Sequence, residues 1–226
     1  MIRNCDINEI SDGRKYGEND MVKCDTGGCK NCFSCCTGMG NTIVLDPYDI
    51  CLLKEATGND FQQLLNSGKI ELNIVDGLIL PNIAMNKNNQ CSFLENSRCS
   101  IHKNRPGICR LFPLGRIYEN NDFLYFVQKD QCKNNNLIKI KVKKWIDTED
   151  LSNYHEYIRK WHYFIKEMGK CMVALKQNEK PELINDVTMF ILNTFFVTNY
   201  NFDNMNVYQF YCEKISEAEK QIKTII

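Results

Sequence analysis

The sequence has no excess of charge of either sign and no long apolar run. Its 28 lysine and arginine residues balance 28 aspartate and glutamate residues, so no global charge favours binding to nucleic acid or to an anionic membrane. The longest apolar run, Met189 to Val197, is interrupted by Asn193 and Thr194 and falls far short of the ~20 residues of a membrane span. We therefore expect no nucleic-acid partner and no membrane span.

Other missing features concern location and cofactors. Residues 1–20 lack the apolar segment of a secretory signal, which predicts a reducing, cytoplasmic location. No G-x-G-x-x-G motif indicates a nucleotide-type cofactor. Histidine is scarce, and none of the three is well placed as a ligand. His102 is expected to pack or to form hydrogen bonds, and His155 and His162 are expected on the partly exposed flank of a helix.

Cysteine, by contrast, is abundant. The chain has thirteen cysteines, and in a reducing compartment clustered cysteines are more often metal ligands than disulfides. Four stand alone and need no function beyond that of small apolar residues, namely Cys5, Cys51, Cys171 and Cys212. The other nine fall between residues 24 and 132, which places the chemistry in that part of the chain.

The first cysteine group reads Cys29-Lys-Asn-Cys32-Phe-Ser-Cys35-Cys36. Two cysteines separated by two residues can direct both sulfurs onto one ion, and here this spacing occurs twice. The same run opens the bacterial ferredoxin signature, but that signature continues to a Cys-Pro pair and this chain continues to an adjacent cysteine. Neighbouring side chains of an extended segment point to opposite sides. We therefore expect Cys35 and Cys36 to serve two centres, or one of them to be no direct ligand.

The second group combines a loop and a helical turn. Cys91 and Cys99 bracket a turn-rich loop, Pro106 begins a turn that carries Cys109, and Cys132 closes the series after a predicted strand. Four thiolates around a divalent ion form an anionic centre. Two neighbouring cations, Arg105 and Arg110, would lower the cost of gathering them.

These two groups together resemble the bacterial YkgJ-type cysteine-cluster family, whose CxxCxxCC domain is described as zinc- or iron-chelating. The resemblance is carried by residues 29–36 and 91–113 and covers roughly residues 24–132. It implies a metal centre held by Cys29, Cys32, Cys35, Cys36, Cys91, Cys99 and Cys109, with Cys132 as an eighth ligand and Cys24 as a further candidate. Flagellin lysine N-methylases carry the same motif but are longer.

The periodicity predicts an α+β fold in two parts, a cysteine-rich metal-binding part over residues 1–146 and about three helices over 147–226. The first part should contain helices near 46–58 and 60–66, a hairpin over 70–83, and strands near 115–118, 123–128 and 138–145. The second should begin with an amphipathic helix of about 28 residues capped by Asp147 or Thr148. A mostly apolar, buried helix should start at Pro181, and a last one should be capped by Asp203.

Three functions fit this pattern. The first is an iron–sulfur protein with an all-cysteine [4Fe–4S] centre, a possible second centre, and a redox, electron-transfer or accessory role toward an unknown protein or redox partner. The second is a structural zinc-binding interaction module. The third is a protein- or peptide-modifying enzyme related to the flagellin lysine N-methylases.

Overall fold

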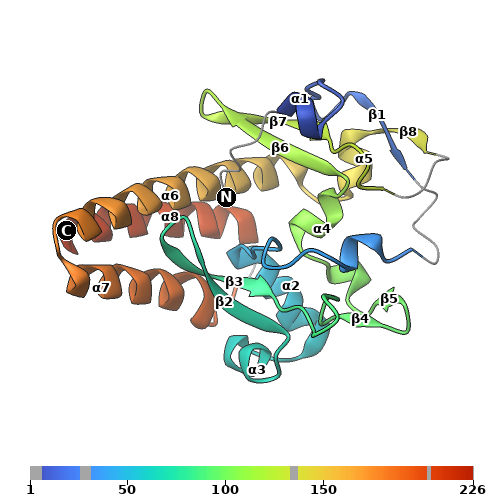
Figure 1. Ribbon diagram of the computed structural model, residues 1–226. Helices are drawn as coiled ribbons and strands as arrows, with labels where there is room; N and C mark the ends of the chain where they lie inside the picture. Colours follow the sequence, from blue (N-terminus) through green and yellow to red (C-terminus); the bar gives the residue numbers. More distant parts are fainter. Residues whose placement is uncertain (1–6, 26–31, 133–136, 203–204, 226) are drawn as a thin grey trace.

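The computed structural model describes residues 7–25, 32–132, 137–202 and 205–225 and shows an α+β protein. Four antiparallel two-stranded sheets account for the named strands of this part of the chain. Figure 1 shows α6 and α8 running alongside each other on one side, with the hairpins and short helices of the cysteine-bearing part on the other. The predicted fold class is confirmed.

Two sheets lie at the end of the molecule away from α7 (Figure 1). After the short helix α1 (Ile7–Ile10), β1 (Met21–Asp25) pairs with β8 (Ile138–Lys141), and β6 (Leu114–Glu119) pairs with β7 (Asp122–Val127). Asn120 and Asn121 form the β6–β7 turn with positive φ. The strand expected over 138–145 is wrong in its second half, because the chain turns at residue 142 into the helix α5 (Val142–Ile146).

The helices α2 (Pro47–Thr57) and α3 (Phe61–Asn66) form where their capping residues predict them. Asp46 and Asp49 form a reciprocal capping box at the start of α2, and Asp60 does the same for α3. The hairpin of β2 (Ile70–Val75) and β3 (Leu78–Ile83) is also confirmed. Its turn residues Asp76 and Gly77 both have positive φ, as a two-residue hairpin turn requires.

Most cysteines of the two groups lie on or beside very short elements. These are the 3₁₀ turns η1 (Ser34–Cys36) and η2 (His102–Asn104), the strands β4 (Leu94–Glu95) and β5 (Arg98–Cys99), and the helix α4 (Gly107–Leu111). Elements of two to five residues bury little surface of their own. Their positions therefore depend on contacts with the rest of the chain.

The C-terminal part consists of α6 (Leu151–Gln177), α7 (Pro181–Leu192), the π-helical turn η3 (Asn193–Val197) and α8 (Val207–Ile225). The predicted cap of α6 is wrong. Asp150 occupies that position in a left-handed conformation without a side-chain cap, and Asp147 ends α5. Helix α7 is less buried than expected, because Met189 is 54% exposed. The predicted cap Asp203 lies outside the described residues.

One hydrophobic core extends through the whole described chain. It joins side chains of α2 and the β2–β3 hairpin, such as Leu53 and Leu80, to side chains of α6 and α8, such as Phe164 and Ile215. The division at residues 146/147 stays a prediction. No helix in the described ranges is both long and apolar enough to cross a membrane.

Candidate metal centre

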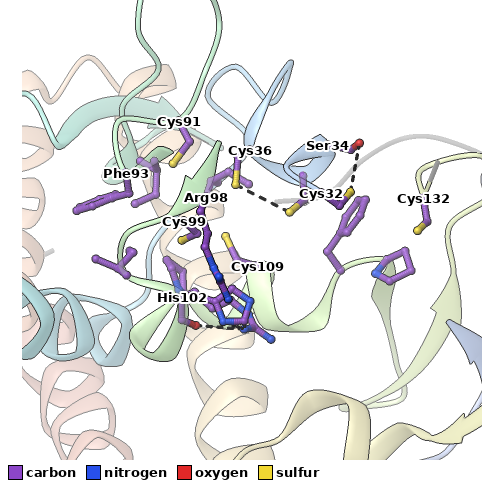
Figure 2. A pocket seen from close by; sticks show the side chains of 18 of the residues that line it. Cys32, Ser34, Cys36, Cys91, Phe93, Arg98, Cys99, His102, Cys109 and Cys132 are labelled. Carbon is purple, nitrogen blue, oxygen red and sulfur yellow. Dashed lines mark hydrogen bonds between the residues drawn. The ribbon is translucent and has the colours of Figure 1, made fainter. Parts of the chain in front are cut away.

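Seven of the predicted ligands line one cavity of about 110 Å³. They come from both cysteine groups and from the segment after β7, namely Cys32, Cys35, Cys36, Cys91, Cys99, Cys109 and Cys132. Figure 2 shows the sulfurs of Cys36, Cys91, Cys99 and Cys109 around a common space, with Cys132 apart from them. Cys29 lies outside the described residues. Cys24 is fully buried in β1 and is not part of the cavity lining.

Backbone hydrogen bonds hold the first cysteine group against the second. The amide of Cys91 donates to the carbonyl of Cys36 over 2.8 Å, and the amide of Gly38 donates to the carbonyl of Asn89 over 2.8 Å. Thr37 and Gln90 form an isolated antiparallel bridge between these two bonds. The ladder fixes Cys36 opposite Cys91, although 54 residues of chain separate them.

The neighbouring thiols of Cys35 and Cys36 reach the same cavity. The expectation of opposite directions is wrong, because residues 34–36 form a 3₁₀ turn and not an extended segment. The two sulfurs are 4.0 Å apart. Two sulfurs on one tetrahedral zinc ion, with Zn–S bonds of ~2.3 Å, would be ~3.8 Å apart. The turn therefore allows both thiols to serve one centre.

Four thiols form the centre of the group. Cys35, Cys36, Cys91 and Cys99 each interact with the other three through hydrogen bonds or through charge. Cys109 interacts by charge with three of them. Burial raises the pKa of the Cys91 thiol, and it raises that of Cys109 well above the ordinary value, with the charge of Asp49 adding to the effect.

The Cys36 thiol is hydrogen-bonded to two neighbours, Cys35 and Cys99. These bonds lower the pKa of both Cys35 and Cys99 to about 7, and the same bonds strongly raise the pKa of Cys36. Thiolates are the species that bind metal. Two thiols of the cavity are thus partly deprotonated at neutral pH.

The two arginines expected beside the cysteines have different positions. Arg105 lines the cavity and contributes to the lowered pKa of Cys35 and Cys99. It also hydrogen-bonds the ring and carbonyl of His102, so this histidine has the hydrogen-bonding role expected of it. Arg110 is 9% exposed and stacks over the rings of Tyr48 and Tyr154, away from the cavity lining.

Helix α4, which carries Cys109, is anchored to α2. The amide of Gly107 donates to Oδ1 of Asp49 over 2.7 Å, which satisfies a free donor at the start of this short helix. Gly107 is needed at this position, because a Cβ there would be 2.6 Å from the hydroxyl of Tyr154. The role of Asp49 was missed from the sequence. Its spacing from Asp46 could have indicated the capping box but not the contact with α4.

The donor set fits a soft metal centre, with some rearrangement. Thiolates select zinc, copper(I) and iron–sulfur clusters over magnesium or calcium. Among the described residues, no three cysteine, histidine or acidic side chains are arranged as ligands of one ion. Binding would therefore include rotations of the thiols. The fold and the site together define a cysteine-cluster metal-binding protein.

Comparison with protein families agrees with this class. Residues 28–138 match the model of the CxxCxxCC family, described as a "Putative zinc- or iron-chelating domain". The match ends close to the start of β8 and includes every cysteine that lines the cavity. Neither the comparison with curated proteins nor that with solved structures gave a match.

Proposed function

We propose that the chain binds an all-cysteine-ligated [4Fe–4S] centre in this cavity and serves a redox, electron-transfer or accessory role. The observation that carries the proposal is the number of thiols. Seven line one cavity, and a single tetrahedral ion would use four of them. A [4Fe–4S] cluster is also held by four cysteines, and it supplies one-electron transfer when bound. The remaining thiols of the cavity could then be ligands of a second centre.

The size of the cavity supports a cluster over a single ion. A buried water needs ~10–15 Å³ of such space, so a cavity of about 110 Å³ has room for several atoms of that size. A lone ion held by four thiolates at ~2.3 Å would leave most of this space empty. The nearby Arg105 would offset part of the negative charge of a thiolate-bound cluster.

Structural zinc is the second candidate, and a different observation favours it. Cys35, Cys36, Cys91 and Cys99 each interact with the other three, and four is the ligand number of a structural zinc site. In that case the domain would be an interaction module stabilised by its metal.

Anaerobic purification followed by metal and acid-labile sulfide analysis separates the two candidates. Iron and sulfide in near-equal amounts, with the brown colour of a cluster, would support the [4Fe–4S] proposal. Stoichiometric zinc in a colourless protein without sulfide would rule it out and support the structural zinc site. The protein should be kept at neutral pH, where the lowered pKa values of Cys35 and Cys99 favour their thiolates.

A further inference from the structure

A second and larger cavity lies beside the cysteine-lined one. Its volume is about 520 Å³, within the range of small-molecule sites. Cys35 and Cys109 line both cavities, so the two share a wall. The other walls come from segments far apart in the sequence, including residues 42–46, 114–118 and 158–166. Nothing in the proposed metal-binding role uses this space.

The guanidinium group of Arg116 is the main charged feature of the second cavity. Its Nη2 donates to the Tyr154 hydroxyl over 2.9 Å, and the rings of Phe123 and Tyr154 lie 5.5 and 5.6 Å from its Cζ. Its Nε is buried, and no acceptor reaches it from the described residues. Within the described ranges no carboxylate forms an ion pair with this arginine.

Three carboxylates line the same cavity. Asp76 belongs to the β2–β3 turn, and the other two are already used by the backbone and by a tyrosine. Asp46 accepts hydrogen bonds from the amide of Asp49 and from the hydroxyl of Tyr157, over 2.9 and 3.0 Å. Asp49 accepts from the amides of Asp46 and Gly107, over 3.1 and 2.7 Å. Arg116 is half-buried and interacts with the charge of Asp46 without an ion pair, and a buried donor such as its Nε is costly to leave without an acceptor. Arg116 therefore has an unused capacity to bind an anion.

The rest of the cavity lining restricts the kind of anion. Leu45, Leu80, Leu114 and Trp161 contribute an apolar surface. The other cation of the lining, Lys166, has its ammonium group 5.7 Å from the ring centre of Tyr163. One cation held beside an apolar wall suits a singly charged group on an apolar body, whereas phosphate dianions are usually held by several donors and cations.

We propose that this second cavity binds a small-molecule monocarboxylate, with its carboxylate on Arg116 and its apolar body against the aliphatic and aromatic wall. Such a ligand would lie next to the cysteine-bound metal, because Cys35 and Cys109 separate the two spaces. The chain would then be a small-molecule-binding protein as well as a metal protein. This binding role goes beyond the proposed metal function. Binding of the small molecule is measured separately from metal content.

Isothermal titration calorimetry of the purified full chain tests the proposal with three probes. These are 3-phenylpropanoate, its neutral analogue 3-phenylpropanamide, and inorganic phosphate. The carboxylate should bind saturably and about tenfold to a hundredfold more tightly than the amide, because a charge-assisted hydrogen bond is lost in the amide. Arg116→Met should reduce carboxylate binding to the level of the amide, while Arg14→Met on the exposed surface should not change it.

A second variant covers the case in which Arg116→Met does not fold. Val44 is half-buried and lines the cavity, so Val44→Phe should occupy part of the space and weaken carboxylate binding with Arg116 intact. Equal affinity for carboxylate and amide would overturn the proposal. So would stronger binding of phosphate, or the absence of saturable carboxylate binding by the parent protein. Iron, sulfide and zinc analysis of the same samples decides the metal proposal independently.

Discussion

At the scale of single residues, Cys36 controls the protonation of its neighbours. Its proton is shared toward the sulfurs of Cys35 and Cys99, which lowers the pKa of each to about 7. The ordinary value is about 9. A depressed pKa means that these thiols become thiolates as the pH rises through 7 and not through 9. Both side chains are half-buried, so reagents can reach them in the metal-free protein.

Replacement of Cys36 by alanine should therefore slow the alkylation of Cys35 and Cys99. Without the donor, their pKa values should return toward the ordinary range, and the thiolate fraction at pH 7 should fall by roughly tenfold or more. The measurement is iodoacetamide labelling of the metal-free protein as a function of pH, followed by peptide mass spectrometry. The rate at Cys171, far along α6, should be the same in parent and variant. An unchanged pH midpoint at Cys35 and Cys99 would contradict the donor role of Cys36.

The position of Cys109 leads to a prediction on metal content. Its thiol lies with Cys35, Cys91 and Cys99 in the cavity, whereas Cys212 is buried in α8 and does not line it. Cys109→Ser should lose most of the bound metal, because a serine hydroxyl is a poor ligand for a thiolate-selecting metal. Cys212→Ser is the matched control and should keep it. Metal analysis with circular dichroism distinguishes ligand loss from unfolding, and full metal content in folded Cys109→Ser protein would contradict the assignment.

At the scale of elements, local signals predicted the structure where a cap or turn was present. The capping box at residues 46–49 and the Asp76-Gly77 turn require no distant contact, and both elements formed as predicted. Residues 142–145 were predicted to continue the strand that begins at residue 138. In the structure Val142 and Ile146 are buried and Trp145 donates to the carbonyl of Leu111, a helical i, i+3, i+4 set.

The anchoring of α4 makes Gly107 sensitive to substitution. A methyl group at this position would be 2.6 Å from the hydroxyl of Tyr154, which is itself held by Arg116. Gly107→Ala should therefore lower the free energy of unfolding by ~1–3 kcal/mol, as overpacking in a filled interior does. Gly17→Ala, whose added methyl would meet its nearest contact at 3.5 Å, is the control. Chemical denaturation measures both, and equal stability of the two variants would show that Tyr154 can move aside.

At the scale of the whole molecule, the two cavities differ in how far the sequence reveals them. The cysteine spacings indicate the first, because most of the cysteines that line it come from two short motifs. The second could not be predicted, since Asp46, Arg116 and His162 come from α2, β6 and α6 and share no motif. His162 is half-buried, in agreement with the partly exposed helix flank expected from the sequence. In the structure it stacks on Tyr118 at 3.5 Å, and burial lowers its pKa to about 4, so it is neutral at physiological pH.

The distribution of the core predicts which parts of the fold depend on the metal. Residues 47–83 contribute fully buried side chains such as Leu53, Leu64 and Leu80, which belong to the same core as the C-terminal helices. The short elements that carry the cysteines, residues 32–36 and 91–111, contribute few, chiefly Phe93, Ile101 and Leu111. Apolar burial at ~25 cal/mol per Å² stabilises the first region far more than the second. Metal–thiolate bonds should supply the difference, because an assembled site does not exist in the unfolded chain.

Removal of the metal should therefore raise backbone hydrogen exchange locally. We expect faster exchange at residues 32–36 and 91–109, and little change at residues 47–83 and along α6, because opening free energies follow local packing. Mass spectrometry of peptides from metal-loaded and chelator-treated protein measures this exchange. Cys109→Ser protein, which should be metal-poor without chelator treatment, is a further sample. Faster exchange throughout residues 32–132, with unchanged exchange after residue 146, would instead support the predicted two-part division. Unchanged exchange at the cysteine-bearing elements would contradict the prediction, because their short helices and strands would then be stable without the metal.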